Sequence, residues 1–314
     1  MRKKNKKYIK KRKTLKKQEL KTKVNSITRS FFKAKIKVIG IGGGGASIVS
    51  EIGRSLDKAT FVIADTDTRS FKKRPRIKYF SFGQKFTRGL GTGLNTNLAK
   101  LAASQEEKKI EGLLKDQDII IFISSLGGGT GSGATPVFIE QIPKDFSGIA
   151  FGIFTLPFKF EGKSKQKIAS KALLQLVKSL NVSLVIPNER IFKVIDSNTS
   201  ITKAFSIVNK NLIENLESLI DLVYNPGVIN IDFADLKTIL RGRGSLAFLN
   251  TVEAVGKDRL EKITKNILHN SLQRSNNFNP ERMLFNVQGG SNLGILEIDK
   301  ISKTISEINP KAKI

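Results

Sequence analysis

Short apolar runs alternate with glycine-rich loops and amphipathic segments from residue 35 to residue 200. The apolar runs predict strands at 36–41, 60–64, 76–82, 118–124, 148–156 and 182–187. Helical spacing of apolar residues is expected over 48–56 and 96–114, and a further helix opens at the glycine loop 127–133. Continuously apolar strands separated by helices are typical of a parallel sheet covered on both faces. We therefore predict an α/β fold with a Rossmann-like parallel sheet, whose ligand-binding loops lie at the carboxyl ends of the strands.

A long helix is predicted over 201–224, because apolar residues repeat at helical spacing up to the turn signal Asn225-Pro226-Gly227. The pattern beyond this turn predicts a second, smaller α+β domain. Its helices are expected at 235–249, 258–270 and 302–308, and its strands at 283–288 and 293–298. We thus divide the chain into a tail, a first domain, a central helix and a C-terminal domain, at residues 1–34, 35–200, 201–224 and 225–314.

Basic residues are concentrated near the N-terminus. Residues 1–35 carry 16 Lys or Arg and one acid, Glu19, so they hold about half of the net charge of +28. Residues 1–23 have few apolar anchors, and we expect a basic, disordered tail. Residues 1–33 are a candidate contact for an anionic membrane or a nucleic acid. A solvated arm and an organelle transit peptide are the alternatives left open.

The composition excludes several kinds of chemistry. The chain has no cysteine and a single histidine, His269, so neither a disulfide, a thiolate or histidine-rich metal site, nor a histidine-based triad is expected. No protein-built metal site is predicted. No apolar run reaches the roughly 18 residues of a membrane span, and no signal peptide is evident, so a soluble, cytoplasmic protein is expected.

The first glycine loop lies between a predicted strand and a predicted helix. Its sequence, Gly40-Ile41-Gly42-Gly43-Gly44-Gly45, satisfies the spacing G-x-G-x-x-G. Asp65 follows Gly45 by 20 residues, where a dinucleotide fold has its ribose-binding acid. On these residues alone, an NAD-binding Rossmann protein is the first interpretation.

A second glycine loop, Gly127-Gly128-Gly129-Thr130-Gly131-Ser132-Gly133, argues against that interpretation. Glycines let the backbone approach phosphate oxygens, and the start of a helix adds unpaired N–H groups and partial positive charge. Two such loops on one sheet edge suit a longer phosphate chain than a single pyrophosphate. The P-loop pattern G-x-x-x-x-G-K-[ST] is absent from the sequence.

The second loop resembles the signature of the tubulin/FtsZ family, and the surrounding sequence is more similar to FtsZ than to tubulin. Segments 36–40, 87–93, 156–162 and 186–190 resemble further FtsZ segments in the same order, and the resemblance runs from residue 35 to residue 314. It implies a protein that binds and hydrolyses GTP and forms filaments of the bacterial cell-division type at the division site. GTP or GDP is the implied ligand, with Mg²⁺ at the β- and γ-phosphates.

The resemblance also implies which residues contact the nucleotide. The implied phosphate-binding residues are Gly43, Gly44, Gly45, Ala46, Ser47, Gly127, Gly128, Gly129, Thr130, Gly131, Ser132 and Gly133. A third loop would close over the γ-phosphate through Gly91, Thr92 and Gly93. The implied contacts to the sugar and its surroundings are Asp67, Glu161, Lys165 and Asn188.

The predicted base-binding residues are Phe205 and Asn209, which share one helix face at a spacing of i, i+4. The resemblance implies that Phe205 stacks on guanine and that Asn209 hydrogen-bonds to the edge of the base. Without the resemblance, Phe205 would be interpreted as a core residue.

The resemblance implies that Asn230, Asp232 and Asp235 are catalytic. Asp232 and Asp235 are i, i+3 at a predicted helix start, where aspartate is also a common cap. In FtsZ the corresponding loop reaches the γ-phosphate of the neighbouring subunit and orients the attacking water. Hydrolysis would then require a head-to-tail contact, and such a contact repeats into a filament.

Departures from the family pattern leave other functions open. Ala46-Ser47 replaces a glycine and an asparagine, and Lys165 replaces an arginine and lacks its bidentate fork. The family sequence extends beyond residue 314, so the C-terminal domain is expected to be incomplete and no division adaptor is predicted. The alternatives are a GTP-binding, co-assembling scaffold with weak or no hydrolysis, and a filament that partitions plasmid DNA. The run 241–245, Arg-Gly-Arg-Gly-Ser, is more basic than the resemblance explains.

Overall fold

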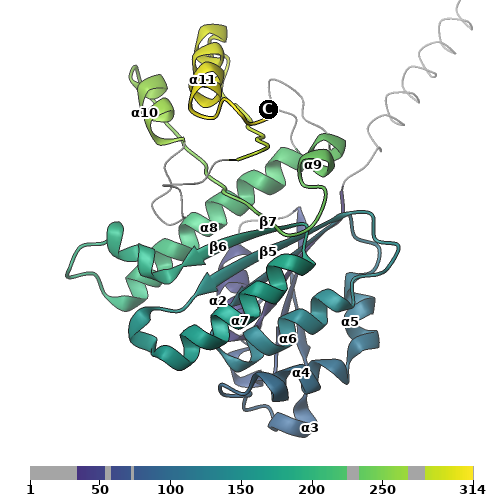
Figure 1. Cartoon of the computed structure of the whole chain (residues 1–314). Helices are drawn as coiled ribbons and strands as arrows, with labels where there is room; N and C mark the ends of the chain where they lie inside the picture. Colours follow the sequence, from purple (N-terminus) through teal and green to yellow (C-terminus); the bar gives the residue numbers. More distant parts are fainter. Residues whose placement is uncertain (1–33, 54–57, 72–73, 225–232, 268–279, 314) are drawn as a thin grey trace, which may run out of the picture. The chain divides into compact units, whose positions relative to one another are not determined.

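The fold comes from a computed structural model that describes residues 34–53, 58–71, 74–224, 233–267 and 280–313 (Figure 1). Within these residues one sheet has the strand order β3-β2-β1-β4-β5-β6-β7, and all pairings are parallel. The strands are β1 Ile36–Ile41, β2 Ala59–Asp65, β3 Ile77–Ser81, β4 Ile119–Ser125, β5 Ile149–Leu156, β6 Val182–Pro187 and β7 Ser245–Leu246.

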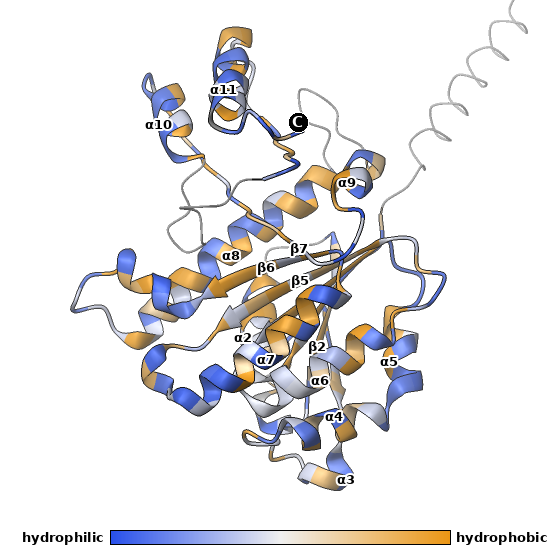
Figure 2. Ribbon diagram, viewed as in Figure 1, coloured by the Kyte–Doolittle hydropathy of each residue, from blue (hydrophilic) through white to orange (hydrophobic). Residues whose placement is uncertain are grey.

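Helices cover both faces of this sheet. They are α2 Gly42–Ile52, α3 Gln84–Thr87, α4 Thr96–Ser104, α5 Glu107–Leu114, α6 Gly129–Glu140, α7 Lys163–Ser179 and α8 Ile201–Tyr224. Side chains alternate along each strand, so that Ile119 and Ile121 pack with α2 and α8, whereas Ile120 and Phe122 pack with α4 to α7. Figure 2 shows the apolar character of β5 and β6. Because both faces of the sheet are buried, the strand sequences are continuously apolar and do not alternate with polar residues.

The strand register brings several loops to one edge of the sheet. Ile41 at the end of β1 pairs with Ala64 of β2 and Ser124 of β4, and Ser125 pairs with Thr155 of β5. The segments that follow these strands therefore meet. Three 3₁₀ turns lie in the loops at this edge: η1 Thr68–Ser70, η2 Lys159–Glu161 and η3 Asn188–Lys193.

The predicted α/β class is confirmed, and the bounds of β1, β6 and α8 agree with the predicted ranges. The single helix expected over 96–114 is wrong, because Glu106 leaves the helical region at φ −117°, ψ 17° and the chain restarts as α5. The second glycine loop is helical from Gly129 onward. Glycine has a low helix propensity, and its presence here is explained by close packing on other backbone segments, which leaves no room for a side chain.

The C-terminal residues differ more from the prediction. Their helices are α9 Phe233–Ile239, α10 Arg259–Asn266 and α11 Ile295–Ile308. The expected helix 235–249 ends early because Gly242 and Gly244 adopt φ of +95° and +84°, and Ser245–Leu246 then joins the sheet as β7.

Neither predicted C-terminal strand forms in the described residues. Residues 283–288 have no strand, although an isolated bridge joins Arg282 to Lys313 nearby. The strand expected at 293–298 is wrong, because this segment enters α11, whose start is fixed by the Gly294 N–H donating to Glu297. A short apolar run does not separate strand from helix by itself.

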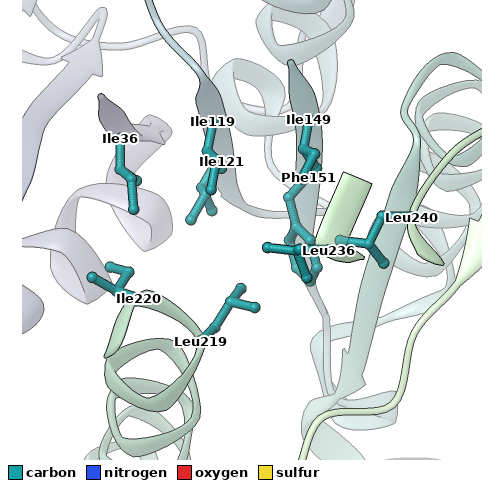
Figure 3. Close-up of a pocket in the computed structure, with 9 residues that line it drawn as sticks. All are labelled: Ile36, Ile119, Ile121, Ile149, Phe151, Leu219, Ile220, Leu236 and Leu240. Carbon is teal, nitrogen blue, oxygen red and sulfur yellow. The ribbon is translucent and has the colours of Figure 1, made fainter. Parts of the chain in front are cut away.

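A small apolar gap lies between the sheet and the helices α8 and α9 (Figure 3). Its volume of about 10 Å³ is too small for a ligand. The gap is lined by Ile36, Ile119, Ile121, Ile149, Phe151, Leu219, Ile220, Leu236 and Leu240. Leu236 is 3% exposed, so α9 is anchored by a core side chain at the amino ends of β1, β4 and β5.

The described residues from Lys35 onward belong to one compact unit, whose core joins the sheet, α8 and Leu236. The division at residues 201 and 225 stays a prediction, and residues 1–33 of the expected tail lie outside the described residues. Among the helices that the structure describes, none combines the length and apolar character of a membrane span.

Candidate functional site

Two helices start at the carboxyl edge of the sheet, each directly after a glycine-rich turn. Helix α2 begins at Gly42, after β1, and α6 begins at Gly129, after β4. Neither of these fully described helices has a side-chain N-cap or an acidic residue in its first turn. Their N-terminal N–H groups and partial positive charges therefore favour an anionic ligand at this edge.

The glycines of these two turns are required by close backbone contacts. Gly42 has φ of +73°, and a Cβ there would lie 2.8 Å from the nitrogen of Gly131. A Cβ on Gly129 would lie 2.5 Å from both the Gly93 carbonyl oxygen and the Thr92 Oγ1. A larger side chain would force the loops apart, so these glycines set the shape of the site.

Buried hydroxyls connect three of the loops. Thr130 Oγ1 is 2.8 Å from Thr66 Oγ1 and 3.1 Å from Thr92 Oγ1, and these three side chains are at most 8% exposed. The Gly129 N–H donates to the Gly93 carbonyl at 2.9 Å. The loop 91–93 is thus held against the second glycine loop by contacts within the chain.

These loops surround a cleft of about 520 Å³, large enough for a nucleotide-sized ligand. Most of the predicted nucleotide-binding residues line it. They are Gly43, Gly44, Asp67, Gly91, Thr92, Gly93, Gly127, Gly128, Gly129, Thr130, Gly131, Glu161, Lys165, Asn188 and Phe205.

The remaining predicted residues are not part of this lining. Gly45 packs on the Ile123 carbonyl, Gly133 packs on α4, and Ala46 is a core residue at 4% exposure. Ser47 is exposed on α2, and Asn209 is 9% exposed on α8. Ser132 is buried, and its Oγ accepts the Gly127 N–H at 2.9 Å, so it holds the loop from inside.

The structure adds lining residues that the tubulin/FtsZ resemblance did not assign to the site. They are Gly42, Asp65, Leu90, Ser125, Leu126, Thr155 and Pro157. Ser125 and Thr155 are register partners at the ends of β4 and β5, and Thr155 Oγ1 donates to Ser125 Oγ at 2.8 Å. Their position in the sequence could have identified them, because polar residues at the carboxyl ends of parallel strands lie at the edge of the sheet where ligands bind.

One wall of the cleft carries charged groups on η2 and α7. Glu161 accepts from the Phe158 N–H and from Lys165 Nζ, both at 2.9 Å. Asn188, the first residue of η3, is 8% exposed at the same wall. The Glu161–Lys165 pair is partly exposed, so its carboxylate remains accessible to a ligand hydroxyl.

Asp67 lies at the opposite wall and caps η1. Its Oδ1 accepts the Arg69 backbone N–H at 3.0 Å, and its Oδ2 accepts the Arg69 guanidinium at 2.8 Å. These hydrogen bonds hold the pKa of the Asp67 carboxyl below its usual value. Asp65 is 3% exposed, and its Oδ1 accepts the Thr66 N–H at 2.7 Å. Asp67 therefore presents an ionised carboxylate to the cleft at neutral pH.

An aromatic cluster borders the cleft near α8. Phe158 is buried, and the rings of Phe160, Phe192 and Phe205 lie 4.8, 5.6 and 5.6 Å from its ring. Phe205 is 40% exposed and lines the cleft, so the interpretation of it as a core residue is not supported. An exposed ring face here could stack on a planar base.

Asp235, the predicted catalytic residue that the structure describes, does not line this cleft in its own chain. Asp235 is exposed in the first turn of α9, which Leu236 anchors at the amino ends of the strands. The glycine loops follow the carboxyl ends of those strands. Asn230 and Asp232 lie outside the described residues. Within the described residues, no group of three or more His, Cys, Asp or Glu could hold a metal.

A parallel sheet with two uncapped, glycine-rich helix starts at one edge defines an α/β protein that binds phosphate groups. The family model described as "Tubulin/FtsZ family, GTPase domain" matches residues 35–196. The chain therefore belongs to the tubulin/FtsZ family. The family and the GTPase class predicted from the sequence are thereby confirmed.

Known relatives agree with this assignment. The mitochondrial division protein fszB of Dictyostelium discoideum is 33% identical over 291 residues, which are 92% of this chain and 78% of that protein. The cell division protein FtsZ of Rickettsia felis is 34% identical over 277 residues, which are 88% of this chain. This match spans only 61% of the length of the Rickettsia protein.

Solved structures show the same fold. An empty FtsZ dimer of M. jannaschii superposes with a TM-score of 0.80 at 29% identity, covering 93% of this chain and 85% of that chain. CetZ from Methanosaeta thermophila has a TM-score of 0.70 at 20% identity, covering 87% and 80%, and shows likeness of fold alone.

Proposed function

We propose that this protein binds GTP in the cleft at the carboxyl edge of its sheet and hydrolyses it within a head-to-tail filament. The observation that carries the proposal is the separation of the two halves of the site. The phosphate-binding loops lie at one edge of the sheet, whereas α9 with Asp235 is anchored at the other edge. A neighbouring subunit would have to bring its α9 to the cleft.

In this proposal the triphosphate lies between the starts of α2 and α6. The N–H groups of 42–45 and 129–131 stabilise its oxygens, and the loop 91–93 faces the γ-phosphate. Glu161 accepts from the ribose hydroxyls. Phe205 stacks on the base, and Asn209 hydrogen-bonds to its edge after a local rearrangement, since Asn209 is 9% exposed.

Mg²⁺ fits the cleft as an ion held mainly by the phosphates and water, the way Mg²⁺ is usually bound in nucleotide sites. Oxygen ligands among its lining residues include the carboxylates of Asp65 and Asp67 and the hydroxyls of Thr92 and Thr130. When bound, the ion supplies charge neutralisation at the β- and γ-phosphates. The chain's own contribution is to hold the phosphates and exclude alternative orientations.

The water-activating step is assigned to the neighbouring subunit. Asp235 of that subunit, together with Asn230 and Asp232, would orient and polarise a water in line with the γ-phosphate. The transition state needs little covalent help from the protein, so positioning supplies most of the acceleration. Assembly and turnover are then a single property.

Exposed apolar side chains around the cleft support self-association. Leu90 is 60% exposed, Phe160 65% and Phe192 54%, which are large values for such residues beside a polar cleft. The M. jannaschii relative was solved as a dimer. The names of the relatives fit a role in division of a cell or an organelle, so we place this protein's filaments at a division site. The basic residues 1–33 would tether them to an anionic surface.

Sedimentation with GTP and with GDP tests the proposal, with released phosphate measured in the same tubes. We expect pelleting and phosphate release with GTP, and neither with GDP. GTP-dependent pelleting without phosphate release would instead indicate the co-assembling scaffold. Phosphate release without any pelleting would contradict the split site.

A further inference from the structure

Helix α7 presents a straight row of exposed lysines. Lys163, Lys167, Lys171 and Lys178, here called the lysine row, are all exposed and recur at spacings of four, four and seven residues. Such spacings place side chains on one side of an α-helix. The opposite side, with Ala169, Ala172 and Leu176, is buried against the sheet layer. The row is therefore an outward face of the folded protein.

No acidic group balances the lysine row within the described residues. Helix α7 has five lysines and no Asp or Glu, and only Lys165, on another side, forms an ion pair, with Glu161. No carboxylate of the described chain lies within 4.0 Å of a lysine of the row. Solvated surface lysines commonly have acids interspersed, so this face is unusually uniform in charge.

The basic face continues beyond the end of α7. The loop 241–244 is tied to the residues after α7, since Asn181 Nδ2 donates to the Gly242 carbonyl at 2.7 Å and the Gly244 N–H donates to the Leu180 carbonyl at 2.9 Å. Arg241 and Arg243 on this loop are both exposed. The basic run that the family resemblance did not explain thus lies beside the end of the lysine row.

The lysine row runs from one edge of the sheet to the other. Helix α7 starts beside the cleft, where Lys165 is a lining residue, and ends before the amino end of β6. Its 15-residue span from Lys163 to Lys178 corresponds to about 22 Å of helix at about 1.5 Å per residue. In a head-to-tail filament, the rows of successive subunits would follow the filament axis.

We propose that the lysine row, with Arg241 and Arg243, is a docking surface for an anionic lipid bilayer. Leu174 lies between Lys171 and Lys178 and is 67% exposed. An apolar side chain among lysines suits the boundary between lipid headgroups and acyl chains, where lysine stems also extend along apolar surface. The exposed residues of α7 include no aromatic ring for stacking on bases, and the exposed Leu174 offers an apolar contact that a phosphate backbone does not use. A bilayer is therefore favoured over a nucleic acid.

This inference rests on the proposed function in one respect, because strong binding to a bilayer requires many lysine rows joined in one filament. A single row binds weakly, but a filament repeats it along one line and converts later contacts into intramolecular ones. Lipid binding is therefore expected to be stronger with GTP than with GDP. The residues 1–33 are present in every variant below, so they do not account for differences between variants.

The test compares two full-length variants with the same change in net charge. The row variant carries Lys163→Gln, Lys167→Gln, Lys171→Gln and Lys178→Gln. The scattered variant carries Lys100→Gln, Lys108→Gln, Lys115→Gln and Lys262→Gln, which alter four exposed lysines elsewhere. Flotation with vesicles of anionic or neutral phospholipid is measured over a salt series, with GTP and with GDP. Binding to duplex DNA is measured in parallel.

We expect the row variant to bind anionic vesicles roughly tenfold or more weakly than the unaltered chain, and the scattered variant to stay within about twofold. An equal loss in both variants would overturn the proposal, as would no loss in either. A row variant that loses DNA binding and keeps vesicle binding would assign the face to nucleic acid. Sedimentation without vesicles measures assembly separately. If GTP does not cause assembly, the proposed function fails, but vesicle binding of the two variants with GDP still tests the lysine row.

Discussion

The two edges of the sheet are built in different ways. At the carboxyl edge, the loops are fixed by glycine contacts and by a buried chain of threonine hydroxyls, and they surround a cleft. At the amino edge, α9 is held by Leu236 and presents Asp235 to solvent. One edge thus has phosphate-binding geometry, and the other has an exposed carboxylate on a rigid support.

Under the proposed function, this difference lets a single chain bind a triphosphate without cleaving it alone. A water-orienting carboxylate beside the γ-phosphate in the same subunit would allow hydrolysis before assembly. Keeping the two parts on opposite edges makes the contact between subunits the step that completes the site. Changes at the carboxyl edge should therefore affect binding, and changes at the amino edge should affect turnover.

The largest effect is expected for Gly129→Ala at the carboxyl edge. The added Cβ would lie 2.5 Å from the Gly93 carbonyl oxygen, so the loop 91–93 must move away from the start of α6. We expect GTP affinity to fall about 100-fold, or about 3 kcal/mol. Equilibrium binding of a fluorescent GTP analogue measures this. The matched control is Gly112→Ala, where a Cβ meets no atom within 4 Å, and its affinity should be unchanged.

The second effect is a loss of turnover in Asp235→Ala at the amino edge. Without this carboxylate the attacking water is not oriented, and phosphate release should fall by about 100-fold or more while GTP affinity stays the same. Asp145→Ala removes another exposed acid and serves as the control. If Asp235→Ala lowered GTP affinity as much as it lowered phosphate release, Asp235 would belong to the nucleotide cleft. The assignment of binding to one edge and turnover to the other would then be wrong.

Mixing separates the two edges further. The Gly129→Ala chain keeps Asp235, and the Asp235→Ala chain keeps an intact cleft. Mixed filaments should release more phosphate than the sum of the two separate preparations, because one variant supplies the acid to the other. A strictly additive rate would count against transfer of the acid between subunits.

A smaller effect is expected for Leu236→Ala, which changes the support of α9 and leaves its carboxylate in place. The truncation enlarges the apolar gap of Figure 3 and should lower the free energy of unfolding by about 2–5 kcal/mol. Urea denaturation measures the change. Leu296→Ala, at a residue that is 79% exposed, should be nearly neutral. Turnover should decrease in Leu236→Ala more than GTP affinity does, if the folded fraction is held equal.

The smallest effect concerns pH and lies away from both edges. Glu297 on α11 accepts from Arg259 of α10 and from the Gly294 N–H, which lowers its pKa from 4.5 to about 2. Because the folded-state pKa is depressed, this stabilisation is present above about pH 4.5 and is lost as the pH falls toward 2. The protection of α10 and α11 against hydrogen exchange, relative to the intrinsic exchange rate at each pH, should therefore decrease in that range. Glu297→Gln should remove the pH dependence and leave GTP binding at neutral pH unaltered.

Much of the carboxyl edge could be predicted from the sequence. Buried parallel strands have continuous apolar runs, and the glycine loops directly follow two of them, so their meeting at one edge follows from topology. The sequence did not reveal that Ser132 points inward to Gly127 or that Thr66, Thr92 and Thr130 form one chain. Such contacts join residues far apart in the sequence and depend on the exact approach of the loops.

The C-terminal residues were less predictable for a physical reason. The segments near Met283 and Leu293 are short apolar runs with little periodicity, and such runs fit a strand or a buried helix equally well. The glycines at 242 and 244 ended a helix that apolar spacing alone extended to residue 249. Here local backbone conformation and a capping contact at Gly294 decided the structure.

Turnover per subunit over a dilution series tests the split site most directly. GTP is kept saturating, and phosphate release is divided by the total subunit concentration at each point. The account predicts a rate per subunit near zero in dilute solution that rises with concentration to a plateau once filaments form. A rate per subunit that stays constant down to concentrations where only monomers remain would contradict it.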